Sequence, residues 1–337
     1  MNSNEKHTIS DVAQMLGVSR ATVSRALNGT PGVGPELRKK IIDFANEIGY
    51  KPNTLARSLS KGRVDIIGLI FGDVRNPFYA ELTFHVQKAL ESHGYTVMIF
   101  NSEYDIAKEI QFLEVSKELC LAGLILFTAQ TNMIEAQFEK LNIPIVFVNR
   151  TLQLQNYDSV LMDNFKAGYI AAMHLIELGH KRIGFINGQA KSSASVERFE
   201  GFKQALKNYY LPLDSEDVLS GNLKMEIGYE LAKQFFQKKS RPSALVIGND
   251  MMALGFMDWC KENQICIPEE LSLVSFDNII FSGIHGIELT TISQQIGEMG
   301  EKAAELMIRR IDNPEADYER IILEPALIVR NTTKKFE

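Results

Sequence analysis

The first fifty residues carry apolar positions at helical spacing in three short runs, which predicts three short helices. The apolar side of the first helix consists of Ile9, Val12, Ala13 and Leu16. Thr8 and Asp11 have the spacing of a capping box, which marks the place where a helix begins. Gly17 permits the left-handed backbone with which a helix often ends, so the first helix is expected to stop there.

The second helix follows after a tight turn and is expected to begin near Ser19, which can cap it. Its inner side has Val23 together with Ala26 or Leu27. Its outer side is small, polar and basic, and it carries Arg20, Ala21, Thr22 and Arg25. Such a face suits the major groove of DNA, although a helical hairpin without a DNA partner could have the same apolar spacing.

A third helix is expected from Pro35 to Ile48, and it would close a small core over the first two. Proline is accepted in a first helical turn, and apolar residues recur at helical spacing as far as Ile48. Gly49 is expected to end this helix. The three helices together form the first expected unit of the chain.

The segment after the third helix has two possible interpretations. The residue before Pro52 avoids the helical conformation, so this part is expected to be extended. Asn53 can then cap a helix over residues 54–61, which is shorter than the roughly 12–15 residues that a lone helix needs in water. Ala56 and Leu59 would share one face. The segment is either a plain linker or a hinge that folds only on DNA, with Leu59 as a minor-groove wedge.

From Val64 the pattern changes to short apolar runs that alternate with amphipathic helices, which predicts parallel sheets covered by helices. The predicted strands are 65–71, 95–101, 122–128, 144–149, 183–188, 218–221, 244–249 and 271–276. The predicted helices are 77–93, 105–119, 132–141, 164–179, 195–209, 224–238, 250–262 and 294–313. Two similar α/β halves thus follow one another, and ligands in such folds bind beyond the carboxyl ends of the strands.

Polar and aromatic side chains follow several of these strands and could bind a ligand. In the first half they are Asp73, Phe78, Tyr79, Asn149 and Arg150, and in the second half Arg198, Asn249, Asp277 and Asn278. Carboxylate, amide and guanidinium groups pair with hydroxyls, and an aromatic face stacks on a sugar ring. Structural roles remain open, because the two aspartates could be helix caps, Phe78 could be core, and Arg198 could pair with a neighbouring glutamate.

Length and charge support more than one domain. A chain of 337 residues exceeds one ordinary core, and two or three domains are expected. The net charge is −6, but residues 1–62 hold nine Lys and Arg against five Asp and Glu. The first unit is therefore basic and the remainder acidic. Only the first unit is expected to contact phosphates.

Several classes of protein do not fit this sequence. The three cysteines, Cys120, Cys260 and Cys266, lack metal-ligand spacing and are expected to be buried thiols in a reducing cytoplasm. No segment approaches the roughly 18 apolar residues of a membrane span, so a soluble, non-exported protein without a membrane partner is expected. The chain has no phosphate-binding loop, nucleophile elbow or His-Glu-x-x-His motif, and neither enzymatic activity nor a cofactor is expected.

The motifs of the first 62 residues resemble those of the LacI/GalR family of bacterial repressors. They are Thr-Ile-Ser-Asp-Val-Ala (8–13), Gly-Val-Ser (17–19), Thr-Val-Ser-Arg-Ala-Leu-Asn (22–28), Gly-Tyr-Lys-Pro-Asn (49–53) and Ala-Arg-Ser-Leu (56–59). The resemblance continues through the body and covers nearly the whole chain. It implies a small all-α helix-turn-helix DNA-binding domain, joined by a hinge helix to a two-lobed α/β body of the type I periplasmic-binding-protein kind, with parallel sheets and three crossovers.

The resemblance also implies domain boundaries. The DNA-binding domain would span residues 1–53, the hinge 54–62, and the effector-binding and dimerisation domain 63–337. The N-lobe would comprise about 63–162 and 291–322, and the C-lobe about 163–290 and 323–332. The three crossovers are expected near Met162, Thr290 and Leu323.

Specific DNA contacts follow from the same resemblance. Base contacts are implied for Arg20, Ala21 and Arg25, with Ala21 limited to apolar contact. Residues on or near the phosphates would be Thr8, Ser19, Thr22, Ser24, Asn28 and Tyr50. In the hinge, Asn53, Ala56 and Leu59 would contact DNA, with Leu59 in the minor groove.

The implied function is repression of carbohydrate-utilisation genes by a homodimer on a pseudo-palindromic operator in double-stranded DNA. A sugar or sugar derivative would bind in the cleft between the lobes, at Asp73, Phe78, Tyr79, Arg150, Arg198, Asn249 and Asp277. A homodimer is expected because no heptad repeat follows Leu327. The protein would be cytoplasmic and associated with the nucleoid through its operator. The alternatives are a nucleobase or nucleoside effector, a protein co-regulator, or a sugar-binding protein without a regulatory role.

Two departures from the family pattern leave the identity of the ligand open. Leu223 stands where several relatives have an aromatic residue over the ligand, and Gln295 replaces a common proline.

The run Lys191-Ser-Ser-Ala-Ser195 leads into the helix that carries Arg198, and free N–H groups at a helix start can bind an anion. A phosphorylated sugar is therefore one candidate effector, and a flexible serine loop capped by Ser195 is the alternative.

The hinge hypothesis makes a direct prediction for Leu59. The substitution Leu59→Gly should weaken operator binding by at least about tenfold, because it removes the apolar wedge and lowers helix propensity. Effector binding should not change, since the pocket is formed by the body. Fluorescence anisotropy with operator DNA and calorimetry with effector measure the two properties, and unaltered operator affinity would contradict the hinge hypothesis.

Overall fold

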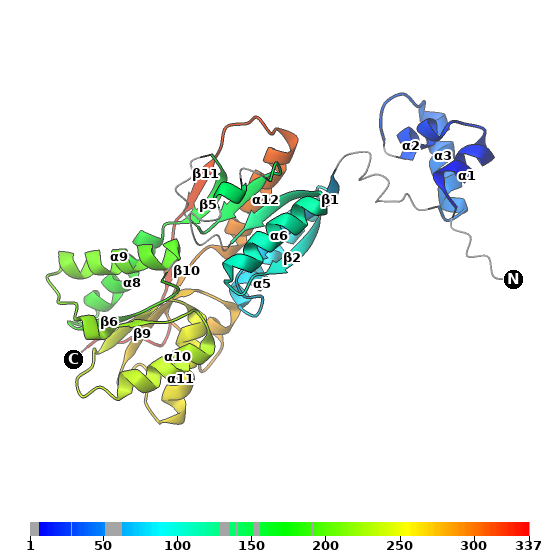
Figure 1. The fold of residues 1–337 in the computed structure, drawn as a ribbon. Coiled ribbons are helices and arrows are strands. Elements are labelled where there is room, and N and C mark those ends of the chain that lie inside the picture. The colour runs from blue at the N-terminus through cyan, green and yellow to red at the C-terminus, as the bar shows by residue number, and fades with distance from the viewer. Residues whose placement is uncertain are drawn as a thin grey trace. The chain divides into compact units, whose positions relative to one another are not determined.

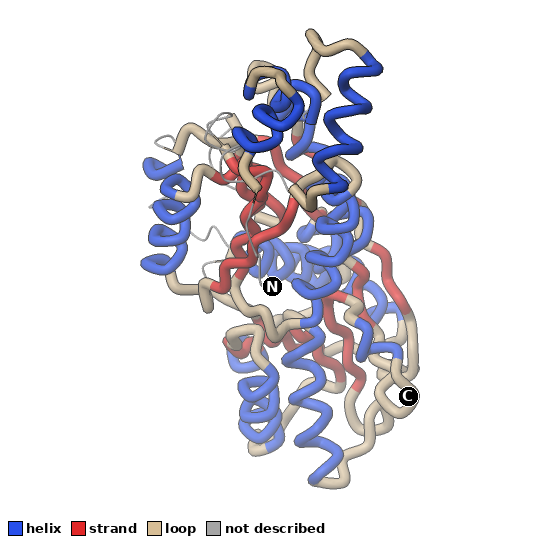
Figure 2. Tube along the Cα trace, turned by 90° about the vertical axis from the view of Figure 1, so that its right-hand side faces the viewer, coloured by secondary structure: helices blue, strands red, loops and turns tan. Residues whose placement is uncertain are grey.

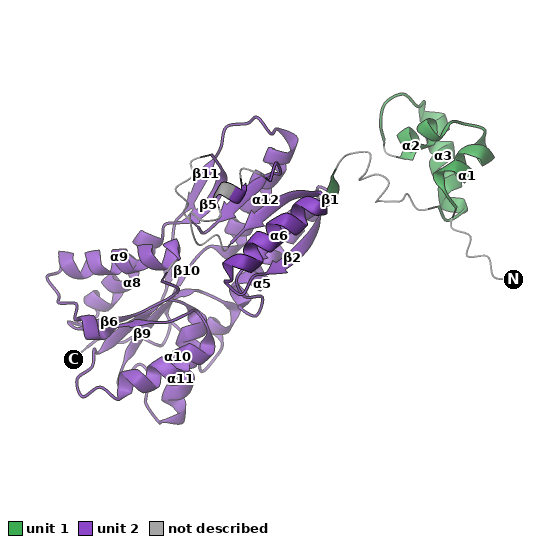
Figure 3. Ribbon diagram, viewed as in Figure 1, with its two compact units in different colours: residues 1–64 green, residues 65–337 purple. Residues whose placement is uncertain are grey.

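The computed structural model describes residues 7–27, 29–50, 63–127, 135–138, 141–150, 156–190 and 192–336. It divides into two compact units, Met1–Val64 and Asp65–Glu337 (Figure 3). The hinge at 54–62, with Asn53, Ala56 and Leu59, lies outside the described residues, as does Asn28. The two units are described separately below.

The described residues of the first unit form the three predicted helices. They are α1 (Ile9–Leu16), α2 (Arg20–Leu27) and α3 (Pro35–Glu47) (Figure 1). The capping box is confirmed, because the Thr8 amide donates to Asp11 over 2.7 Å and the Asp11 amide to Thr8 over 3.4 Å. The Ser19 hydroxyl accepts from the Thr22 amide at 3.0 Å, which caps α2 as expected. The inner sides of the helices form one small core around Ile41.

The N-lobe of the second unit contains a parallel sheet in the order β11-β5-β4-β3-β1-β2. Its strands are β1 (Val64–Phe71), β2 (Thr96–Asn101), β3 (Leu121–Leu126), β4 (Ile145–Val148), β5 (Asp158–Met162) and β11 (Arg320–Leu323). Its helices are α5 (Pro77–Glu91), α6 (Ile106–Glu118), α7 (Glu135–Phe138) and α12 (Ile296–Asp312). Helices α5 and α12 pack against each other and cover one face, while α6 packs on β3 (Figure 1).

The C-lobe contains a second sheet in the order β12-β10-β9-β8-β6-β7. Its strands are β6 (Ile183–Asn187), β7 (Val218–Ser220), β8 (Ala244–Ile247), β9 (Ser272–Asp277), β10 (Thr291–Ser293) and β12 (Ala326–Ile328). Its helices are α8 (Asn164–Glu177), α9 (Ser193–Asn208), α10 (Met225–Phe236) and α11 (Asp250–Glu262), with 3₁₀ turns η1 (Ser215–Asp217) and η2 (Ile280–Gly283). Figure 2 shows red strands between layers of blue helices in the body.

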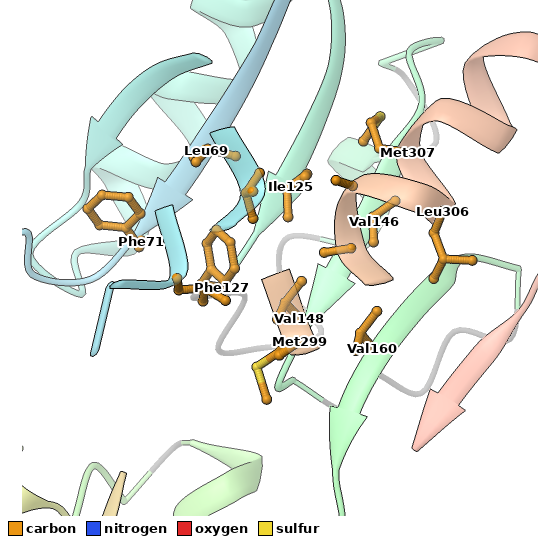
Figure 4. Packing of buried hydrophobic residues seen from close by; sticks show 14 of the residues in the cluster. Leu69, Phe71, Ile125, Phe127, Val146, Val148, Val160, Met299, Leu306 and Met307 are labelled. Carbon is orange, nitrogen blue, oxygen red and sulfur yellow. The ribbon is translucent and has the colours of Figure 1, made fainter. Parts of the chain in front are cut away.

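Alternating apolar side chains of the strands build each core. In the N-lobe, Leu69 and Phe71 of β1 point to the same side as Ile125 and Phe127, as a period of two requires. Met299, Leu306 and Met307 of α12 pack against this side of the sheet (Figure 4). In the C-lobe, α8 with α9 and α10 with α11 bury separate apolar clusters on the two faces. None of the described helices is both long and apolar enough to cross a membrane.

The chain passes between the lobes at three places. The chain passes between lobes after β5, which ends at Met162, and after β11, which ends at Leu323. The crossover expected near Thr290 lies later, because β10 pairs in parallel with β9 and antiparallel with β12 in the C-lobe sheet. Residues 291–293 therefore belong to the C-lobe, and the N-lobe resumes at about residue 296.

Some expected elements need further correction. The strands β5, β10, β11 and β12 were not expected, and they lie next to the crossovers, outside the regular alternation of strands and helices. Of the helix expected at 132–141, only residues 135–138 are described as helical. The expectation of three buried cysteines is wrong for Cys120 and Cys266, which are exposed in the loops after α6 and α11. Only Cys260 is buried, and all three are free thiols.

The close packing of α8 on α9 depends on two glycines. A Cβ added at Gly201 would lie 1.9 Å from the carbonyl oxygen of Phe165, and one at Gly168 would lie 1.8 Å from that of Arg198. Both contacts are with backbone, so the helices would have to separate. Because α9 carries Arg198, this packing also fixes the position of a predicted site residue.

We predict that Gly201→Ala destabilises the body by about 2 kcal/mol or more, even though alanine favours a helix by about 1 kcal/mol over glycine. Gly283→Ala is the matched control, because its added Cβ would meet only the Arg330 side chain, at 3.7 Å or more. Urea unfolding of both variants measures the difference. Equal stability of the two variants would show that the α8–α9 contact does not limit packing.

Candidate functional site

The outer side of α2 is available to a partner, as the sequence predicts. Arg20, Ala21 and Arg25 are exposed, whereas Val23 and Ala26 on the opposite side are buried. Thr22 and Ser24 lie between these sides and are half-buried. A short helix with two arginines on an open face can donate to base edges and phosphates.

The residues expected to contact phosphates differ in their solvent exposure and in the bonds that they already make. Ser19 is exposed, but its hydroxyl lies 2.8 Å from that of Thr22, so both also serve the start of α2. Thr8 is exposed and caps α1. Tyr50 is only 9% exposed and packs in the core of the first unit. Little of the Tyr50 side chain is therefore available for a phosphate contact.

A cavity lies between the two lobes of the body. Six of the predicted effector residues line it: Phe78, Tyr79, Arg150, Arg198, Asn249 and Asp277. They come from both lobes, at or near the carboxyl ends of strands, where this architecture is expected to bind a ligand. Asp73 is not among the lining residues. Its carboxylate instead accepts from the Arg75 guanidinium at 2.9 and 2.7 Å, and this pairing lowers the pKa of Asp73.

Four of the lining residues, Asn149, Gln294, Asp277 and Arg198, form a closed ring of buried polar side chains with Asn164. The amide group of Asn149, after β4, donates to Gln294, and Gln294 donates to Asp277 at the end of β9. Asp277 lies 3.9 Å from the Arg198 guanidinium. Arg198 donates to Asn164 at 2.9 Å, and Asn164 donates back to Asn149 at 3.0 Å.

This ring connects the lobes at their crossovers. Asn164 is the first residue of α8, directly after the crossover that follows β5, and Gln294 lies in the crossover between β10 and α12. Asn149 belongs to the N-lobe, whereas Arg198 and Asp277 belong to the C-lobe. Any ligand that changes the partners of Arg198 or Asp277 therefore acts on groups that hold the lobes together.

Arg198 is held by several contacts. It is 6% exposed, donates to the Gly248 carbonyl over 2.9 Å, and lies 4.6 Å from the centre of the Phe276 ring. Burial lowers the pKa of Arg198 from its usual value, because a charged guanidinium loses hydration there. The side chain is thus fixed before a ligand arrives, which reduces the entropy lost on binding.

A second carboxylate fixes the end of β9. Asp250, at the start of α11, is fully buried and accepts from Ser282 at 2.6 Å, Thr291 at 2.7 Å and the Ile279 amide at 3.0 Å. Burial raises the pKa of Asp250. These bonds hold the chain that follows Asp277, whose φ of 117° is rare for a residue with a side chain. Such a backbone persists only where its surroundings fix it.

An aromatic wall covers the N-lobe side of the cavity. The Tyr79 ring stacks on Phe71 at 5.2 Å between centroids and meets Phe78 edge-on at 5.3 Å. The hydroxyl groups of Tyr79 and Tyr104 are 3.5 Å apart, and both residues line the cavity. Burial raises the pKa of both tyrosines, so both present neutral hydroxyl groups.

The sequence did not single out several residues of the site. Gln294 is one of them. Its neighbour Gln295 is a departure from the family pattern, but no local sequence feature indicates that the Gln294 side chain faces the cavity. Tyr104 reaches the cavity because its φ of 62° turns the chain after β2. Leu223 does line the cavity, and its carbonyl accepts from Asn249 at 3.1 Å. In the described part of the chain, no group of His, Cys, Asp and Glu side chains could hold a metal ion.

A helix-turn-helix unit together with a two-lobed body around a polar cleft defines a class: a DNA-binding protein with a small-molecule domain. The family described as bacterial regulatory proteins, lacI family, matches residues 8–53. The family described as periplasmic binding proteins and sugar binding domain of LacI family matches residues 64–334. The chain belongs to the lacI family of bacterial regulatory proteins. It is a DNA-binding transcriptional regulator, as its sequence predicts, and not an enzyme.

Individual relatives agree with this assignment over almost the whole length. The chain is 32% identical over 332 residues to the HTH-type transcriptional regulator DegA of Bacillus subtilis, covering 97% of this chain and 98% of DegA. It is 30% identical over 330 residues to the HTH-type transcriptional repressor PurR of Mannheimia succiniciproducens, covering 97% and 99%.

Among solved structures, the lac repressor dimer bound to operator and the anti-inducer ONPF matches with a TM-score of 0.86. The match covers 98% of this chain and 100% of that chain at 21% identity, so the two share a fold. The expected fold class, a helix-turn-helix domain with a two-lobed α/β body, is confirmed.

The buried site predicts an unusual dependence of stability on pH. Burial raises the pKa of Asp277 to about 7 from its ordinary value of 3.8. Between these two pH values the folded protein keeps the proton and the unfolded chain releases it, so stability falls as pH rises.

We therefore expect the unfolding free energy of the wild type to fall by at least about 1 kcal/mol more than that of Asp277→Asn between pH 5 and pH 7.5. Urea unfolding of the ligand-free proteins at both pH values gives this difference. Parallel pH dependence of the two proteins would mean that Asp277 titrates normally.

Proposed function

We propose that this protein is a repressor that binds a pseudo-palindromic operator as a homodimer and is controlled by a small molecule in the cleft of the body. The effector is a sugar or sugar derivative, and the controlled genes serve carbohydrate use. The protein acts in the cytoplasm, on the nucleoid. The observation that carries the proposal is the ring through Asn149, Arg198 and Asp277, which gives a cleft ligand direct access to the contacts between the lobes.

The DNA-binding part of the proposal is supported by the exposed face of α2. Arg20 and Arg25 lie on the open side of a capped helix, in a unit that is basic although the whole chain carries a net charge of −6. Two such units on a symmetric dimer would read one half-site each. The hinge, as inferred from its sequence, would connect each unit to a body.

Dimerisation is supported by a group of exposed apolar side chains in the body. Ile280 is 72% exposed, and Phe281 and Ile284 beside it are 42% and 46% exposed. Phe84 on α5 is 60% exposed. Single exposed apolar residues are ordinary, but several within five positions of the chain favour a surface that a partner covers.

The effector class is supported by the chemistry of the cleft. Amide, guanidinium and carboxylate groups beside aromatic rings suit a polyhydroxylated ligand, and the family that matches the body is described by its sugar binding. A nucleobase or nucleoside is the second candidate, because the aromatic rings of Phe78 and Tyr79, which line the cavity, would also suit a planar ligand. A protein co-regulator would instead bind outside the cleft.

The ligand would act through its different affinities for the two arrangements of the lobes. A ligand that binds one arrangement better shifts the population toward it, and the DNA-bound fraction changes accordingly. Arg198 and Asp277 are positioned to sense occupancy, because each already has a partner in the ring that a ligand hydroxyl can replace.

We expect Arg198→Ala to bind operator within about threefold of the wild type while its effector affinity falls by about 100-fold. The loss corresponds to one or two hydrogen bonds from a charged donor. A thermal-shift screen of sugars and sugar derivatives first identifies the ligand, since a native-state ligand raises the melting temperature.

Calorimetry and operator anisotropy then compare Arg198→Ala with Arg241→Ala, whose guanidinium lies over the Phe236 ring outside the cavity. The control is expected to respond to effector normally. An Arg198→Ala protein that still changes its operator affinity with effector would refute the proposed pocket.

A further inference from the structure

Arg150 stands out among the charged side chains of the cleft because, within the described residues, it forms no ion pair. It is 6% exposed, and its hydrogen bond to a described residue runs from Nη1 to the carbonyl of the adjacent Asn149, at 2.7 Å. Its Nε is buried and has no acceptor within the described part of the chain. Among those same residues, no carboxylate lies within the 4.0 Å of an ion pair with Arg150.

An incompletely bonded buried guanidinium costs stability, because the charge has lost water without gaining acceptors. The other cationic side chain of the cavity is different: Arg198 has Asn164, the Gly248 carbonyl and Asp277 around it. Unsatisfied buried groups in native structures call for an explanation, and one explanation is a ligand that supplies the missing acceptor. Arg150 lines the cavity, where such a ligand would lie.

A second group of donors faces the same cavity. Helix α9 begins at Ser193, two residues earlier than expected, and the cap residue Ser192 makes no side-chain bond to the first turn. Ser192, Ala194 and Ser195 all line the cavity. The first backbone N–H groups of a helix have no intrahelical acceptor and carry the positive end of the helix dipole. Lys191, which precedes them, lies outside the described residues.

The balance of charge in the cavity favours a negative ligand. Of the side chains that line it, two are guanidinium groups, Arg150 and Arg198, and one is a carboxylate, Asp277. That carboxylate already accepts from Gln294 and faces Arg198. Among the described lining residues, the guanidinium groups therefore outnumber the carboxylates by one.

We propose that the effector is an anion, a polyhydroxylated molecule with a carboxylate or phosphate group, and that Arg150 and the start of α9 bind this group. The inference rests on the proposed function in one respect: the cleft is taken to be the effector site. Ligand hydroxyl groups would reach Arg198, Asp277 and Asn249, while the anionic group completes the bonding of Arg150. A neutral sugar could accept hydrogen bonds from that guanidinium but would bring no negative charge to it.

The test uses the full-length protein and inorganic phosphate as the probe. Melting temperatures are measured at pH 7.5 in phosphate, acetate or chloride at one ionic strength, for the wild type, Arg150→Gln, Arg150→Lys and Arg241→Gln. Phosphate stabilises many proteins by exclusion from their surfaces, so the test is the difference between variants in the rise of the melting temperature. Arg241→Gln is the matched control, since Arg241 does not line the cavity.

The wild type and Arg241→Gln should melt several degrees higher in phosphate or acetate than in chloride. Arg150→Gln should lose most of this rise, and Arg150→Lys should keep part of it because it retains the charge. The anion that gives the larger rise assigns the group as phosphate or carboxylate. Equal melting temperatures of the wild type in all three salts, or an undiminished rise in Arg150→Gln, would overturn the proposal.

A parallel measurement separates this inference from the proposed function. Operator anisotropy is recorded with glucose, glucuronate and glucose 6-phosphate as a matched neutral and anionic set. Regulation by the neutral sugar without any anion-dependent stabilisation would refute the anion site and leave the repressor function intact. Anion-dependent stabilisation with no specific DNA binding under any condition would refute the repressor function and leave the anion site intact.

Discussion

A ring of four hydrogen bonds and one ion pair, through Asn149, Gln294, Asp277, Arg198 and Asn164, is the contact on which the arrangement of the body depends. Each member is buried, and each bond is made in a medium where an unsatisfied polar group is costly. Two members lie at crossovers between the lobes, so the ring can only close when the lobes are held in one arrangement. Apolar packing also joins the lobes, because Ile279, Met251 and Leu254 of the C-lobe pack against the N-lobe core, but the cores lie mainly within the separate lobes.

The same ring explains how residues that bind the ligand can also control the arrangement of the two lobes. Arg198 and Asp277 face the cavity and also belong to the ring, so a ligand there competes with or completes existing bonds. The positive φ of Asp277, held by the bonds of Asp250 to the following chain, keeps this carboxylate directed at its partners. A ligand gains affinity from groups that are already fixed, and its differential affinity for the lobe arrangements is the source of regulation.

The sequence predicted most of the helices and the long strands, since these have strong periods of 3.6 or two. It also predicted lining residues that follow strands, such as Asp277 at the end of β9 and Arg198 on α9, the helix after β6. It did not predict strand β10 or the inward direction of Gln294, because pairing of three residues and the direction of one amide depend on contacts made by distant parts of the chain. Asp73 follows β1 but does not line the cavity, and its carboxylate pairs with Arg75, only two residues away.

The most direct test of the ring is a double-mutant cycle between Asn149 and Gln294, which come from the N-lobe and from a crossover. Asn149→Ala, Gln294→Ala and the double variant are unfolded in urea without ligand. The ring predicts a coupling free energy of about 1 kcal/mol or more, because either single change already breaks the shared bond. Losses that add to within about 0.3 kcal/mol would contradict the claim that this bond joins the lobes.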